Sequence, residues 1–154
     1  MLLGIKSIYD KTGITDGKRI LVDRLWPRGV RRSTANIDTW MRDIAPSNAL
    51  RLKLNAHAEW WPVFKKKYTS ELERNTLVNT LINRAKRDDI MLLYASRDQR
   101  HNNAVVLYGF VTKRIRYLQS EERKKIAEKY KARLFKAKMR EAANAAKLGK
   151  KLSA

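Results

Sequence analysis

The chain has 154 residues, which is enough for one domain with a sizeable core but too few for two domains of ordinary size. Its 35 Lys and Arg residues against 15 Asp and Glu give a formal charge of +20, which favours polyanionic partners and nucleic acid first. The absence of cysteine excludes disulfides and thiolate chemistry, and no apolar run approaches the roughly 20 residues of a membrane-spanning helix. We expect no metal or cofactor, and a cytoplasmic protein associated with the nucleoid.

The first elements in chain order are two strands, over residues 2–9 and 19–23, which we expect to lie side by side. From Ala35 the apolar residues through Ile44 recur at helical spacing, and this run stops before Pro46, so we predict a helix here. Ser47 is a suitable N-cap for a short following helix.

Residues 60–72 carry an aromatic face with a spacing of four and predict a further helix, and another is expected through residues 77–82. Ile90 to Ala95 is an unbroken apolar run typical of a strand buried on both faces, and a polar loop and a helix follow it. The fold class is therefore α/β, with a small sheet of about three or four strands, partly parallel and flanked by helices.

A basic helical extension is expected at the C-terminal end. Residues 119–154 hold 12 Lys and Arg against 4 acidic residues, so we divide the chain into a domain over 1–118 and a basic tail over 119–154. Ser120, followed by two glutamates, is expected to open the tail helix. Its narrow apolar side, which includes Ile126 and Leu134, predicts partial docking, with fraying over 149–154.

Two loops carry the residue types from which a binding site is built. Arg24 and Arg28 can hold an oxyanion, and Trp26 can stack on a ring. In the second loop His101 can transfer a proton, Asp98 can orient its imidazole, and Asn102 adds a polar contact. If the two preceding strands are neighbours, both loops face one crevice, which would suit a phosphorylated or nucleotide-like substrate. This predicts an enzyme or small-ligand binder.

Structural interpretations remain open for the same residues. Asp23 and Arg24 could form an ion pair, Trp26 could cover the core and residues 27–29 could form a turn. His101 and Asn102 could only end a strand and cap a helix, and His57 at a helix entry is better explained structurally.

The leading hypothesis is nonspecific binding of nucleic acid through phosphate contacts, for which deletion of the tail should remove most affinity. The alternatives for the tail are a solubilising extension or a contact with an acidic protein or a ribosomal assembly. The cations assigned to nucleic acid are Arg31, Arg32, Arg123, Lys124, Lys125, Lys129, Lys131, Arg133, Lys136, Lys138 and Arg140.

The motifs over residues 1–118 resemble the DUF488 family, in its YeaO-like branch. The resemblance rests on Val22–Gly29, on Trp40 with Ala45-Pro46-Ser47, on several residues between His57 and Leu72, and on Leu92–Ala95 with Asp98, His101 and Asn102. It implies a compact α/β domain and no defined activity. Arg31 and Arg32 stand where family members commonly place Ser-Lys-Glu, and the tail extends beyond the usual domain.

Overall fold

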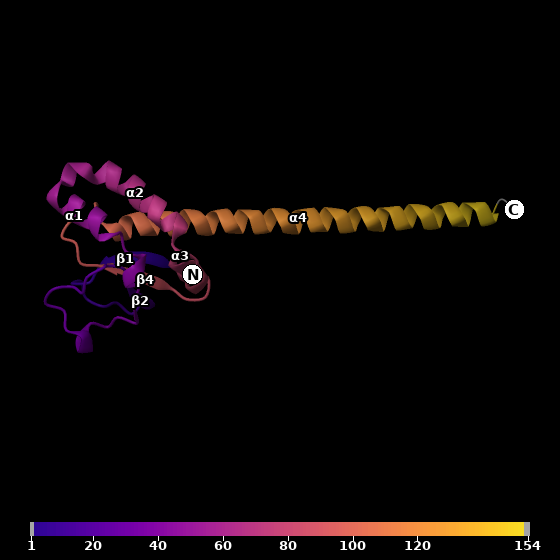
Figure 1. Ribbon diagram of the computed structural model, residues 1–154. Helices are drawn as coiled ribbons and strands as arrows, with labels where there is room; N and C mark the ends of the chain where they lie inside the picture. Colours follow the sequence, from indigo (N-terminus) through magenta and orange to yellow (C-terminus); the bar gives the residue numbers. More distant parts are fainter. Residues whose placement is uncertain (1, 153–154) are drawn as a thin grey trace. The chain divides into compact units, whose positions relative to one another are not determined.

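The computed structural model describes residues 2–152, and side chains up to residue 148. Four strands, β1 (Leu3–Ser7), β2 (Lys18–Leu21), β3 (Thr39–Trp40) and β4 (Ile90–Tyr94), form one sheet in the order β1-β4-β2-β3 (Figure 1). Every pairing between these strands is parallel. The α/β class with a small sheet and flanking helices is therefore confirmed.

The expectation that the first two strands are neighbours is wrong, because β4 lies between β1 and β2. The apolar composition of β4 explains its central position: Ile90, Leu92 and Leu93 are at most 1% exposed, whereas every residue of β1 is only half-buried. A strand whose two faces are both apolar is best placed where both faces are covered. The predicted crevice requires that β2 and β4 are neighbours, and these two strands pair directly.

The predicted helix over residues 35–44 is also wrong. Thr39 and Trp40 instead form β3, which pairs with Ile20 and Leu21 of β2, and a short 3₁₀ turn η2 (Arg42–Ile44) follows. The indole Nε1 of Trp40 donates to the carbonyl oxygen of Asp23 across 2.7 Å. These contacts with β2 override a helical spacing that holds only a few apolar side chains.

The next three helices agree with the sequence predictions. In α1 (Asn48–Ala56) the Oγ of Ser47 accepts from the backbone N–H of Leu50, which confirms Ser47 as the N-cap. Helix α2 (Trp61–Arg74) lies beside α1 and buries Phe64, Tyr68 and Leu72 (Figure 1). Helix α3 (Thr76–Ala85) buries one apolar face before the chain enters β4.

A tight turn leads into β2. Gly17 has a φ of +63°, and a Cβ atom at this position would lie 2.2 Å from the carbonyl oxygen of Asp89. Next to it the buried Asp16 pairs with Lys6 at 2.7 Å and with Arg19. The Lys6 ammonium, with smaller contributions from Gly13 and Arg19, lowers the pKa of the Asp16 carboxyl. Glycine is required at position 17 both because of its positive φ and because a Cβ atom would not fit beside Asp89.

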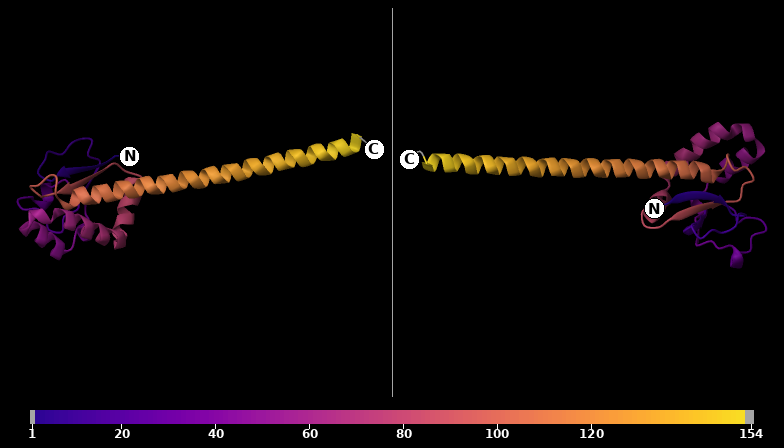
Figure 2. Two further views of the ribbon diagram at one scale, coloured as in Figure 1. Left: turned by 90° about the horizontal axis from the view of Figure 1, so that it is seen from above. Right: turned by 180° about the vertical axis from the view of Figure 1, so that it is seen from behind.

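Helix α4 (Asn103–Leu152) is one continuous helix, as both views of Figure 2 show. The predicted helix start at Ser120 is therefore wrong, because the first turns of α4 continue through that position. Gly109 is the single glycine between 103 and 148, and the segment holds no proline, so nothing in it breaks a helix. The predicted fraying also differs: backbone helix reaches Leu152, and residues 153 and 154 lie outside the described residues.

The chain divides into two compact units, one up to Arg114 and one from Ile115 onward. Within the first unit the core is formed by the central strands, α2, α3 and the first turns of α4, where Leu107 and Val111 are fully buried. In the second unit all side chains from 122 to 148 are exposed, including Ile126 at 62% and Leu134 at 46%. The described apolar side of the tail is thus open to solvent.

Candidate functional site

The loops that follow β2 and β4 are joined by hydrogen bonds. The Oδ2 atom of Asp23 accepts from the backbone N–H of Ala95 at 2.7 Å, and Nδ2 of Asn103 donates to the carbonyl of Val22 and to Oδ1 of Asp23. Burial raises the pKa of the Asp23 carboxyl, and the bonds from Ala95 and Asn103 partly oppose this effect. The ends of the two strands therefore meet, as the crevice hypothesis requires.

In the loop after β4, Asp98 and His101 lie in direct contact. The Oδ2 atom of Asp98 is 3.0 Å from Nδ1 of His101, and its Oδ1 accepts from the backbone N–H groups of Arg100 and His101. These backbone bonds, that of His101 first, lower the pKa of the Asp98 carboxyl. When the imidazole donates from Nδ1 to this carboxylate, its Nε2 carries the lone pair. The rings of His101 and Trp61 also pack in a T-shaped arrangement, with ring centroids 4.9 Å apart.

Beside this pair is a cavity of about 190 Å³. Its lining includes Ser96, Asp98 and His101 from the loop, Phe64 from α2, and Arg51 from α1. The Nε atom of Arg51 is buried and has no hydrogen-bond partner among the described residues. Sequence reasoning missed Arg51. The available signal was that Arg51, Leu54 and Asn55 share one face of α1, and all three line the cavity.

Arg24 has a different position from the one that anion binding would need. Its Nε donates to the carbonyl of Pro46 at 2.9 Å and its Nη2 to that of Ala45 at 3.2 Å, while Nη1 lies 3.7 Å from a carboxylate oxygen of Asp43. The structure shows no ion pair between Asp23 and Arg24. Arg24 is not in the lining of the His101 cavity, although Pro46 is.

The carbonyls of residues 43–46 are all held by side chains from distant elements, and we call this arrangement the carbonyl clamp. Nδ2 of Asn75 donates to Asp43 at 2.8 Å, and the hydroxyl of Tyr68 donates to Ile44 at 2.9 Å. Arg24 holds the other two carbonyls. Glu71 completes the segment by accepting from the backbone N–H of Ser47 at 2.9 Å. Because this segment has no regular secondary structure beyond η2, side chains satisfy its backbone.

Trp26 and Arg28 also lie away from the cavity. The indole Nε1 of Trp26 donates to the carbonyl of Val30, and the ring packs at 5.4 Å, edge to face, on Trp40. The guanidinium of Arg32 lies 4.5 Å from the Trp26 ring centroid. Arg28 is exposed, and Gly29 has a φ of +73° within the turn over residues 27–30. These contacts match the structural interpretation of the loop, in which Trp26 covers the core.

Asn102 lines the cavity but uses its amide locally. It is 2% exposed, its Nδ2 donates to the carbonyl of Asp98, and its Oδ1 accepts from the backbone N–H of Val105. This is the N-cap of α4, as one of the two sequence interpretations expected. His57 is exposed and lies 3.2 Å from Glu59. The structure thus brings Asp98, His101 and Asn102 together and leaves Arg24, Trp26 and Arg28 outside.

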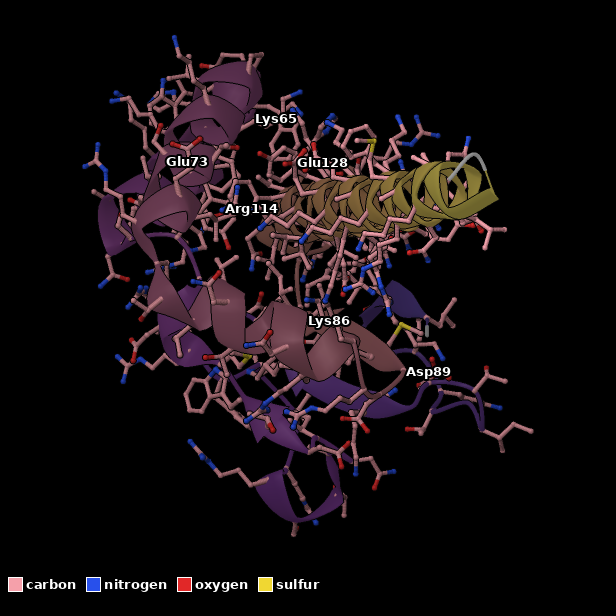
Figure 3. The ribbon with its side chains drawn as sticks, turned by 90° about the vertical axis from the view of Figure 1, so that its right-hand side faces the viewer. Lys65, Glu73, Lys86, Asp89, Arg114 and Glu128 are labelled. Atoms are coloured by element: carbon pink, nitrogen blue, oxygen red, sulfur yellow. The ribbon has the colours of Figure 1, made fainter. Side chains whose placement is uncertain are left out.

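Eight of the nine predicted nucleic-acid residues of the tail fall into two rows on α4, and Arg123 lies outside both. One row has a spacing of 4, 4, 3 and 4, which places its members on one helix face; we call it the basic stripe, and it consists of Lys125, Lys129, Arg133, Lys136 and Arg140. Lys124, Lys131 and Lys138 recur every seven residues on another face, and Lys124 pairs with Glu121 at 3.0 Å. Figure 3 shows side chains projecting all round this part of α4, including Glu128. Arg31 lines a separate cavity that also includes Lys11 and Arg19.

Among the described residues, no three His, Asp or Glu side chains gather in an arrangement that could hold a metal ion. None of the described helices is both long and apolar enough to cross a membrane.

Residues 2–135 match the family model described as the inactive DUF488-N3 subclade. The chain belongs to the DUF488 family. Among its relatives, the uncharacterized protein YeaO of Escherichia coli (strain K12) is 35% identical over 108 residues, which is 70% of this chain and 94% of YeaO. The uncharacterized protein Rv3073c of Mycobacterium tuberculosis (strain ATCC 25618 / H37Rv) is 30% identical over 67% of this chain and 87% of its own. No solved structure matches significantly. The DUF488 match reaches residue 135 and so includes the first part of the basic stripe.

Proposed function

We propose that this protein binds nucleic acid nonspecifically, through contacts of the basic stripe with backbone phosphates. The observation that carries the proposal is the alignment of five cations on one exposed face of α4 in a chain of formal charge +20. All five side chains are exposed, and among the described residues none of the five takes part in a hydrogen bond or ion pair. Exposed lysines and arginines in such a row neutralise phosphates without reading bases.

The length of the stripe suits a nucleic-acid backbone. Residues 125–140 of a helix rise by about 22 Å, and one strand of B-DNA presents about six phosphates over that length. Five flexible cations can therefore each reach a separate phosphate. The second row has fewer members, and its Lys124 is engaged with Glu121. The stripe is thus the face that we expect to lie against the backbone.

The description of the matching family as inactive supports a binding role over catalysis. No observation on the described residues requires a reaction. The juxtaposition of Asp98 and His101 also occurs in binding sites, where the carboxylate fixes the ring. The catalytic hypothesis for this pair stays a prediction.

The test compares two charge-matched triple variants of the full chain. Replacing Lys129, Lys136 and Arg140 by glutamine removes three stripe charges, whereas replacing Lys124, Lys131 and Lys138 by glutamine removes three charges from the other row. Glutamine preserves helix propensity. Affinity for a random 20-base-pair duplex is measured by fluorescence anisotropy from 50 to 300 mM NaCl.

Five phosphate contacts predict a slope of log K against log salt of about −4.5 for the wild-type chain. The stripe variant should reduce the slope by almost 3, and the control variant by less than 1. Equal effects of the two variants would show that net charge alone matters and would contradict the stripe. Wild-type binding that does not respond to salt would contradict the function itself.

A further inference from the structure

We infer that the cavity between α1 and the loop after β4 binds a phosphate group, with Arg51 as its cationic partner. The inference is independent of the nucleic-acid proposal, because the cavity lies wholly within the first compact unit and shares no residue with the basic stripe. It also revises the crevice expected from the sequence. The anion-binding arginine is Arg51 from α1, in place of Arg24 and Arg28.

The main observation is that the guanidinium of Arg51 has a buried donor without a partner among the described residues. Its Nε is buried and no acceptor among the described residues reaches it. Arg24, by contrast, is engaged with two backbone carbonyls and a carboxylate. A buried donor on a permanently charged group is disfavoured unless an acceptor reaches it. Since no described residue supplies one and Arg51 lines an open cavity, we take an oxyanion in that cavity as the partner of its guanidinium.

Two further donors line the same cavity. The Oγ of Ser96 already accepts from the backbone N–H of Asp98 at 3.2 Å, so its hydroxyl hydrogen remains to be donated. In the imidazolium form of His101, Nδ1 donates to Asp98 and Nε2 donates toward a ligand oxygen. The Asp98 carboxylate is the opposing charge in the lining, and it is occupied by two backbone N–H groups and the imidazole. Arginine, hydroxyl and imidazole donors together select an oxyanion.

The size of the cavity limits the ligand. At about 190 Å³ it holds about six water volumes, which accommodates a phosphoryl group but is smaller than the roughly 300 Å³ at which pockets for drug-sized molecules begin. A phosphorylated ligand would place its phosphoryl end here and the remainder outside. Arginine matches the oxygens of such a group in bidentate geometry.

The test uses the full chain and inorganic phosphate in 150 mM NaCl, where weak binding to the tail is screened. Amide and imidazole NMR shifts are followed during the titration in the wild-type chain, in Arg51→Gln, and in Lys53→Gln. The last variant is the matched control, because it removes one charge from an exposed position of the same helix. Adenosine 5′-monophosphate and adenosine are titrated in parallel arms to distinguish free phosphate from the phosphoryl end of a nucleotide.

We expect saturating shifts at Ser96 and His101 in the wild-type and Lys53→Gln chains, and at least tenfold weaker binding in Arg51→Gln. Adenosine should produce no shifts there. If Arg51→Gln does not fold, Ser96→Ala provides the second variant, with an expected loss of about threefold. Equal phosphate binding by Arg51→Gln and the wild type would overturn the inference, as would shifts confined to the lysines of the tail.

Discussion

The backbone N–H of Ala95 and the carboxylate of Asp23 form a 2.7 Å hydrogen bond that fixes the end of β4 against the end of β2. The same carboxylate accepts from Asn103 at the start of α4. One half-buried acidic side chain thus joins the end of β2 to two segments that lie more than 70 residues later in the sequence. The position of the phosphate cavity depends on this arrangement, because Asn103 also lines it.

Replacement of Asp23 by alanine should lower the free energy of unfolding by about 2–3 kcal/mol, because two donors lose their acceptor in a partly buried place. Urea denaturation followed by circular dichroism measures the change. Asp10→Ala is the control, since Asp10 is exposed, and should stay within about 0.5 kcal/mol of the wild type. Equal stabilities of the two variants would contradict the role assigned to Asp23.

Replacement of Arg24 by glutamine should destabilise the fold by about 2–3 kcal/mol, because the carbonyls of Ala45 and Pro46 lose a charged donor. Arg28→Gln, at an exposed position of the same loop, should change stability by less than about 0.5 kcal/mol. Guanidinium denaturation measures both. A loss of phosphate binding in Arg28→Gln would instead support the crevice that the sequence predicted around Arg24, Trp26 and Arg28.

The Asp98 carboxyl should make stability depend on pH in a defined direction. Its pKa is lower in the folded chain, so its contribution is fully present above the ordinary Asp pKa of about 3.9 and is lost as the pH falls through the lower folded value. In Asp98→Asn this contribution is absent at every pH. The stability difference between wild type and variant should therefore shrink between pH 6 and pH 2.5. A difference that stays constant would show that the bonds to Arg100 and His101 are not linked to ionisation.

Gly17→Ala and Gly109→Ala should have opposite effects. A Cβ at Gly17 meets the carbonyl of Asp89 at a positive φ, so we expect a loss of about 3 kcal/mol or more. At Gly109 nothing lies within 4 Å of the added Cβ, and alanine inside α4 should raise stability by about 0.5–1 kcal/mol. Thermal unfolding measures both changes. A stabilised Gly17→Ala variant would contradict the described turn.

The sequence patterns predicted those features that depend on contacts between residues close together in the chain. The aromatic face of α2, the Ser47 cap and the pairing of Asp98 with His101 each involve residues within a few positions of one another, and the structure shows all three. The two-residue strand β3 could not be predicted, because Thr39 and Trp40 are held by β2, about 20 residues earlier. Strand order is likewise a property of distant pairs.

One part of the candidate site, the loop after β4, could be predicted from the sequence, and the other part could not. Asp98, His101 and Asn102 follow directly from one strand and its loop, so their grouping needed no knowledge of the fold. Arg51 is one cation among many on helix surfaces, and only the packing of α1 against the loop distinguishes it. The sequence around Arg24 carries the stronger signal and predicts that it binds an anion, but backbone carbonyls hold its guanidinium.

The carbonyl clamp has a consequence for the order of events in folding. Its donors, on Arg24, Tyr68 and Asn75, lie 21 to 32 residues from the carbonyls that they hold. We expect such bonds to close after β2 and α2 have come together, and therefore on the native side of the rate-limiting barrier. Shortening these side chains should therefore accelerate unfolding and leave the refolding rate nearly unchanged, which makes residues 43–46 the part of the chain that sets how long the folded molecule lasts.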